Sequence, residues 1–232
     1  MFTDRLCFHF SKPVLTTYTK TMLDMNIHMH TQFPAGPKII AANHPSTTDP
    51  FFVAVMLRQQ SFILINDLLF QVPLLGSYLH ASGHIPVCAG AGQTAIQSAL
   101  DHLKSGHNVI IFPEGDLSPL EGGFQKPRTG VARLAIMSGA PVIPVGVHLQ
   151  PERVHLINST VRGQVNVGRW YFRGPYNLTI GRPMQFSGDV EDRGLVRATA
   201  TRIMNQIIEL ANESRNRMHS NPGFFSEAQS LA

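Results

Sequence analysis

Two hydrophobic patterns alternate along this chain. In one, apolar residues are consecutive or occupy every second position, and in the other they recur at helical spacing. The first pattern predicts β-strands, at residues 26–30, 38–43, 62–65, 108–112, 141–147, 163–173 and 177–180. The helical spacing predicts helices, at residues 12–24, 50–58, 93–104, 131–138 and 195–210. We therefore expect an α/β fold, a single domain with a mixed central sheet and flanking helices.

The first stretch with candidate chemistry is Asn43 to Pro50, which follows a predicted strand. Asp49 stands at a helix N-cap position, and His44 lies five residues earlier on the strand-to-helix turn. On a regular helix the two side chains would point about 140° apart, so contact requires the irregular turn that Pro45 favours. A carboxylate that holds an imidazole fixes its tautomer and raises its basicity, as a general base requires. Alternatively, Asp49 only caps a helix and His44 only fills a turn.

A second stretch follows the predicted strand at residues 108–112, where Pro113, Glu114 and Gly115 end it. Ligands of open α/β sheets bind beyond the carboxyl ends of strands, so we expect both stretches to form one active site. Glu114 can bind a hydroxyl, and backbone N–H groups beside Gly115 can bind an oxyanion. The alternative for Glu114 is a solvated loop acid.

Two cations, Lys126 and Arg128, precede the predicted helix that begins at Val131. Cations beside a helix N-terminus form an anion site, so we place a phosphate there, from a bound substrate. The alternative is a solvated basic turn.

Four blocks of the sequence together resemble a known family. They are His44-x-x-x-x-Asp49, Gly83 to Val87, Phe112 to Gly115 and Ala140 to Gly146. Their order and spacing are similar to those of the glycerolphosphate/lysophospholipid acyltransferase family, which includes 1-acylglycerol-3-phosphate O-acyltransferases. The resemblance covers roughly residues 37–147, with a tail to about residue 210. We expect an N-terminal helix and strand lead-in (1–36), an acyltransferase domain (37–212) and a polar tail (213–232).

The resemblance implies transfer of a fatty acyl group from acyl-CoA or acyl carrier protein to a hydroxyl of a lysophospholipid-like or other lipid acceptor, in phospholipid or glycolipid synthesis. His44 is then the general base and Asp49 supports it, with no cofactor and no metal. The residues expected to bind substrate are Glu114, Gly115, Lys126 and Arg128. Members of the family often carry arginines where this chain has Cys88 and Leu117. Either Lys126 and Arg128 replace them in gripping an acceptor phosphate, or the acceptor is a different hydroxyl compound.

Composition indicates where the protein works. Charged residues are 15% of the chain, below the roughly 25% of soluble domains, and the net charge is +4. This balance favours an anionic membrane surface, and no basic run with interleaved aromatic residues indicates nucleic acid. Two cysteines, Cys7 and Cys88, fit a reducing compartment, and residues 1–24 lack the pattern of a signal peptide. We expect a cytoplasmic protein peripherally associated with the membrane, in an oligomeric state that the sequence leaves open.

Two further segments have alternative interpretations. Leu68 to Leu100 contains no Lys, Arg, Asp or Glu, and either lines a groove for an acyl chain or forms ordinary core. Its prolines and glycines argue against a membrane span. His28 and His30 share a face of a predicted strand and could bind a metal, but no third ligand is evident nearby, so we favour a surface strand.

Two other functions stay open. One is a hydrolase, either metal-dependent through His28, His30, His44 and Asp49 or a thioesterase that uses the His44–Asp49 pair with water. The other is a non-catalytic lipid-binding protein.

Overall fold

The computed structural model describes residues 2–161 and 164–220. Its main sheet contains the strands β1 (Met25–Met29), β2 (Ile39–Ala42), β3 (Ser61–Asn66), β4 (Ile85–Val87), β5 (Asn108–Ile111), β6 (Val142–Leu149) and β9 (Tyr176–Ile180). The helices are α1 (Phe2–Thr21), α2 (Asp49–Val55), α3 (Leu75–Ala81), α4 (Gly92–Lys104), α5 (Gly130–Ser138) and α6 (Arg193–Ser220), with short 3₁₀ helices η1 (Asp67–Gln71) and η2 (Pro151–Arg153). A hairpin of β7 (Val154–Val161) and β8 (Gln164–Tyr171) stands apart from that sheet.

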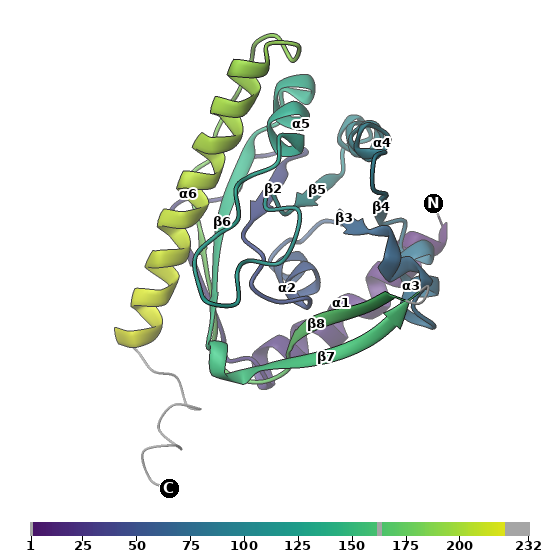
Figure 1. Ribbon diagram of the computed structural model, residues 1–232, viewed down its shortest axis with the longest axis vertical. Helices are drawn as coiled ribbons and strands as arrows, with labels where there is room; N and C mark the ends of the chain where they lie inside the picture. Colours follow the sequence, from purple (N-terminus) through teal and green to yellow (C-terminus); the bar gives the residue numbers. More distant parts are fainter. Residues whose placement is uncertain (1, 162–163, 221–232) are drawn as a thin grey trace, which may run out of the picture.

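The order of strands in the sheet is β1-β9-β6-β2-β5-β3-β4 (Figure 1). The five strands from β6 to β4 in this order are parallel, β9 is antiparallel to β6, and β1 is parallel to β9. The predicted α/β fold with a mixed sheet is confirmed. Because β2 and β5 are parallel neighbours, with Ala41 opposite Ile111, the segments that follow them leave the same edge of the sheet side by side.

Helices cover both faces of the sheet, and the alternation of side chains along β2 divides the core between them. Ile39 and Ala41 belong to the cluster beneath α4, α5 and α6, whereas Ile40 and Ala42 belong to the cluster beneath α2 and α3, to which α1 adds Tyr18. All four β2 side chains are fully buried. Burial on both faces explains why β2 reads as a continuous apolar run in the sequence.

The long helix α6 packs closely against β6 (Figure 1). A Cβ atom at Gly146 would overlap the backbone of Leu210 and Ala211, so only glycine admits this approach. We expected the helix to end at Leu210 and a polar tail to begin at residue 213. That expectation is wrong for residues 213–220, which continue the helix, and tertiary hydrogen bonds hold some of their polar groups. The Ser214 hydroxyl, for example, lies 2.9 Å from Gly146 O and 2.7 Å from Thr179 Oγ1.

Three other elements differ from the prediction. The first helix begins at Phe2 rather than at residue 12 and contains Pro13. The strand expected at residues 163–173 is one arm of the β7–β8 hairpin, and residues 162–163 lie outside the part that the structure describes. No helix among the described residues is long and apolar enough to cross a membrane.

Candidate active site

The turn between β2 and α2 brings His44 and Asp49 into contact. Thr48 holds the N-cap position of α2 and Asp49 is its first residue, so the carboxylate of Asp49 is free to turn back toward the preceding segment. His44 Nδ1 lies 3.1 Å from Asp49 Oδ2. The contact that needed an irregular turn is therefore present, and the alternative in which Asp49 only caps the helix is wrong.

Asp49 is fully buried and hydrogen-bonded by three groups. Besides the imidazole, Ser46 N donates to Oδ2 at 2.7 Å and the Tyr176 hydroxyl donates to Oδ1 at 2.8 Å. Burial raises the pKa of Asp49, and its bonds to His44, Ser46 and Tyr176 act against this rise by favouring the charged form. The carboxylate is thereby held in one orientation toward the ring.

The imidazole of His44 is fixed on a second side by an aromatic ring. Its ring stacks on Phe112 with centroids 4.3 Å apart and planes 26° from parallel. The side chain is 17% exposed. Because Nδ1 faces Asp49, we assign the proton to Nδ1, and Nε2 is then the basic atom available to a substrate.

Glu114 links the two segments that the sequence singled out. Its Oε1 accepts bonds from His44 N at 3.0 Å and from Ser118 Oγ at 2.7 Å, and its Oε2 accepts one from Gln125 N at 2.7 Å. The residue is 2% exposed, so the alternative of a solvated loop acid is wrong. These contacts position the backbone of His44. The predicted contact of Glu114 with an acceptor stays a prediction.

Gly115 and Arg128 lie together beside Glu114. Gly115 has φ +67°, a backbone conformation that favours glycine, and a Cβ atom there would displace the side chain of Arg128, whose Cδ and Nε lie against it. Arg128 N donates to Pro113 O at 2.8 Å, which places this residue against the loop after β5 and just before α5. Arg128 and Lys126 are both exposed, and no carboxylate pairs with Arg128 among the side chains that the structure describes.

Two further residues of the site, Tyr176 and Arg169, were not predicted from the sequence. Tyr176 comes from β9, 127 residues after Asp49, and no local pattern marks it. Thr47 N donates to the carbonyl of Arg169 in β8 at 2.7 Å, and Arg169 N donates to Thr47 Oγ1 at 3.0 Å. The guanidinium of Arg169 donates to Ser118 O. The β7–β8 hairpin thus contacts both the turn after β2 and the loop after β5.

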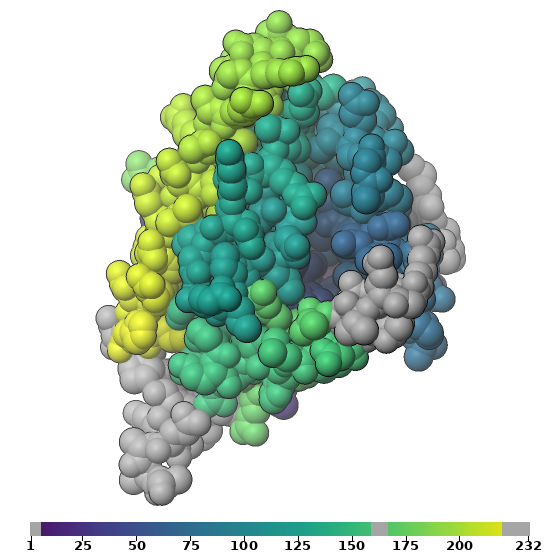
Figure 2. Space-filling model, in the orientation of Figure 1, coloured from purple at the N-terminus to yellow at the C-terminus, as the bar shows by residue number. Residues whose placement is uncertain are grey.

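The surface around these loops is hollowed. Figure 2 shows a hollow framed by the teal loop between β5 and α5, the blue α4 and the green β7–β8 hairpin, with dark blue atoms of an earlier part of the chain at its floor. A substrate in this hollow would meet the carboxyl-terminal edge of the sheet, where ligands of such folds bind.

Comparisons with known proteins indicate the family of the chain. A family model described as Acyltransferase matches residues 24–148. The chain is 27% identical over 150 residues to a 1-acyl-sn-glycerol-3-phosphate acyltransferase from Saccharomyces cerevisiae, a match that covers 62% of this chain and 48% of that protein. This chain therefore spans about half the length of the curated relative.

A solved structure is similar in fold. It is the crystal structure of the 1-acyl-sn-glycerophosphate (LPA) acyltransferase, PlsC, from Thermotoga maritima, with a TM-score of 0.59 and 20% sequence identity. The match covers 89% of this chain and 79% of that chain.

The buried bond from Tyr176 to Asp49 makes stability depend on pH. In Tyr176→Phe the pKa of Asp49 rises, because a donor to its charged form is lost. Stability falls with rising pH from the ordinary pKa of 3.8, where the unfolded carboxyl ionises, up to the raised pKa of the buried carboxyl. A still higher folded pKa in the variant extends this fall, so the deficit relative to wild type grows with pH. We expect it to be small near about pH 4 and about 2 kcal/mol near about pH 7, by urea unfolding.

Tyr171→Phe is the matched control, since the hydroxyl of Tyr171 donates to the neutral carbonyl of Pro175 at 2.8 Å. Its deficit should be about 1 kcal/mol at both pH values. A pH-independent deficit in Tyr176→Phe would contradict the role of its hydroxyl.

Proposed function

Because this chain belongs to the acyltransferase family, we propose that it is an O-acyltransferase. It moves a fatty acyl group from acyl-CoA or acyl carrier protein to a hydroxyl of a lysophospholipid-like acceptor, in phospholipid synthesis. The observation that carries the proposal is the His44–Asp49 pair, with Nδ1 held at 3.1 Å by a buried carboxylate and the opposite ring nitrogen available. The curated relative, whose printed name includes 1-acyl-sn-glycerol-3-phosphate, supports this acceptor class.

The reaction begins when Nε2 of His44 removes the proton of the acceptor hydroxyl. The oxygen attacks the thioester carbonyl carbon and forms a tetrahedral oxyanion, while Asp49 stabilises the imidazolium. We assign the oxyanion to a backbone N–H group of the loop after β5. Gly115 N already donates to Phe112 O at 3.0 Å and Leu117 N to Asp116 Oδ1 at 2.8 Å, so the donor is another N–H group of this loop. Collapse of the intermediate breaks the C–S bond, and the imidazolium returns its proton to the thiolate. The products are an ester and a free thiol, and these steps require neither a covalent enzyme intermediate nor a cofactor.

The acceptor phosphate binds Arg128, with Lys126 nearby on the same loop. Arg128 lies against Gly115 and immediately before α5, so its charge and the first N–H groups of that helix face one region. These cations take the place of the arginines that relatives carry where this chain has Cys88 and Leu117.

The lipid substrate suggests how the protein meets a membrane. Leu6, Phe10 and Val14 recur every four residues along α1 and are 47%, 71% and 69% exposed. Such a stripe is suited to lie in a membrane interface, and the net charge of +4 favours anionic lipids. The opposite side of α1, with Phe8 and Leu15, lines a narrow pocket shared with α2, α3 and β3. We therefore place the protein in the cytoplasm, peripherally attached.

The metal-dependent hydrolase is not favoured. Among the described residues, His28 and His30 form a group with Glu213 and do not share one with His44 and Asp49. A thioesterase would use the same His44–Asp49 pair with water in place of the acceptor, and a non-catalytic lipid-binding protein would not need the pair.

Replacing His44 tests the proposed base. His44→Ala should lower the rate of acyl transfer from palmitoyl-CoA to lysophosphatidate by about 10²–10⁴-fold, because no other group takes the hydroxyl proton. Acylated product is quantified by mass spectrometry, and circular dichroism should be unchanged. His155→Ala, at an exposed position on β7, is the matched control and should keep wild-type activity. Near-wild-type transfer by His44→Ala would sink the mechanism.

Replacing Arg128 tests the phosphate site. Arg128→Ala should raise KM for a phosphate-bearing acceptor about 10-fold or more, because charge-assisted bonds are lost, whereas KM for monoacylglycerol should not change. Arg128→Lys should recover part of the loss. Lys104→Ala, another exposed cation at the end of α4, should behave as wild type. Equal effects on both acceptors would contradict a phosphate contact, and KM for palmitoyl-CoA, measured separately, detects a contact with the donor.

A further inference from the structure

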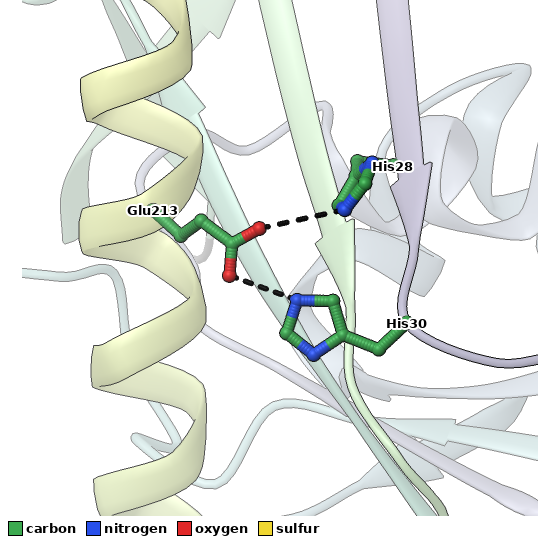
Figure 3. Close-up of side chains that lie close together, drawn as sticks. All are labelled: His28, His30 and Glu213. Carbon is green, nitrogen blue, oxygen red and sulfur yellow. Dashed lines mark hydrogen bonds and ion pairs between the residues drawn. The ribbon is translucent and has the colours of Figure 1, made fainter.

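Three potential metal ligands converge on the surface between β1 and α6 (Figure 3). His28 and His30 point to the same side of β1, with ring centroids 5.6 Å apart, and Glu213 reaches them from α6. Glu213 Oε2 lies 2.9 Å from His30 Nε2, and Oε1 lies 3.7 Å from His28 Nε2. The sequence analysis found no third ligand because Glu213 is 183 residues from His30 along the chain.

We propose that His28, His30 and Glu213 bind a divalent transition-metal ion of the zinc class. Two imidazole nitrogens and one carboxylate oxygen are donors that such ions prefer. Bonds of about 2.1 Å in a tetrahedral site place ligand atoms about 3.4 Å apart. The separations of 2.9 Å, from His30 Nε2 to Oε2, and 3.7 Å, from His28 Nε2 to Oε1, lie on either side of that value but involve different oxygens of Glu213. With one ligand atom from each residue, all three lie within 4.8 Å of one another.

The neighbouring cation does not occupy the site. Arg217 lies one turn beyond Glu213 on α6, close enough for the carboxylate to act on its charge. Its guanidinium is committed elsewhere: Nη1 bonds Asn26 Oδ1, and Nη2 bonds Leu178 O at 2.8 Å and Thr179 Oγ1 at 3.1 Å. Arg217 therefore ties α6 to β1 and β9 and leaves the oxygens of Glu213 directed at the two histidines.

A metal ion bound by these three side chains would link the edge strand β1 to α6. β1 is an edge strand that pairs with β9 in the part of the chain that the structure describes, and most of its side chains are exposed. An ion held by β1 and α6 at once would bind the folded chain and not the unfolded one, and so would stabilise it. The side chains of His28, His30 and Glu213 are 51%, 33% and 35% exposed, so a fourth coordination position is open to water. The inference does not rest on the proposed function.

The test uses the full chain without an affinity tag. Calorimetric titration with zinc chloride should give one ion per chain, and zinc should raise the melting temperature. Cobalt(II) should give the visible absorption of a four-coordinate ion. His28→Asn, His30→Asn and Glu213→Gln should each weaken zinc binding by more than about 100-fold, since even outer-shell partners are worth 10–100-fold. His9→Asn, an exposed histidine on α1, is the matched control and should bind as wild type.

Melting temperatures measured in EDTA distinguish a loss of metal binding from a loss of stability of the metal-free protein. Glu213→Gln retains a hydrogen-bonding side chain, so it should melt with wild type in EDTA and fail to gain stability from zinc. The absence of one-to-one binding by the wild type would overturn the proposal. Zinc affinity that stays at the wild-type level in each of the three variants would also overturn it. The histidines and Glu213 would then serve only to link β1 to α6 through hydrogen bonds.

Discussion

The buried carboxylate of Asp49 is the constraint on which the site depends. Removing an ionised carboxylate from water costs several kcal/mol, and the fold offsets this by surrounding it with three donors from different places. These are the ring of His44, the backbone of Ser46 and the hydroxyl of Tyr176. Since Asp49 begins α2 and Tyr176 lies in β9, the imidazole of His44 can be oriented only when the sheet and the helix are both in place.

The parallel pairing of β2 with β5 supplies the second half of the site. It brings Glu114 to the backbone of His44, although the two residues are 70 positions apart. A buried acid that accepts bonds from both loops makes their relative position rigid, which a proton transfer at fixed geometry requires. The β7–β8 hairpin adds Arg169, which contacts both loops from a third direction.

Local sequence patterns predicted the parts of the site that short segments of the chain determine by themselves. The strand-to-helix turn with His44 and Asp49, and the strand end with Glu114, are visible because apolar runs and prolines bound them. Tyr176 and Glu213 were not predictable in their roles, because their partners lie 127 and 183 residues away, across strand pairings that no single segment encodes. The end of α6 was placed too early for a related reason, since polar residues such as Ser214 are buried by tertiary hydrogen bonds.

We propose that His44, oriented by Asp49, removes the proton of a lipid hydroxyl, which then takes the acyl group directly from a thioester. The most direct measurement is thiol release from palmitoyl-CoA with and without a panel of lysophospholipids, glycerol 3-phosphate and glycolipids. The account predicts release that requires one acceptor class and yields one acylated acceptor for each thiol. Thiol release at the same rate without any acceptor would contradict it and would assign the pair to thioester hydrolysis.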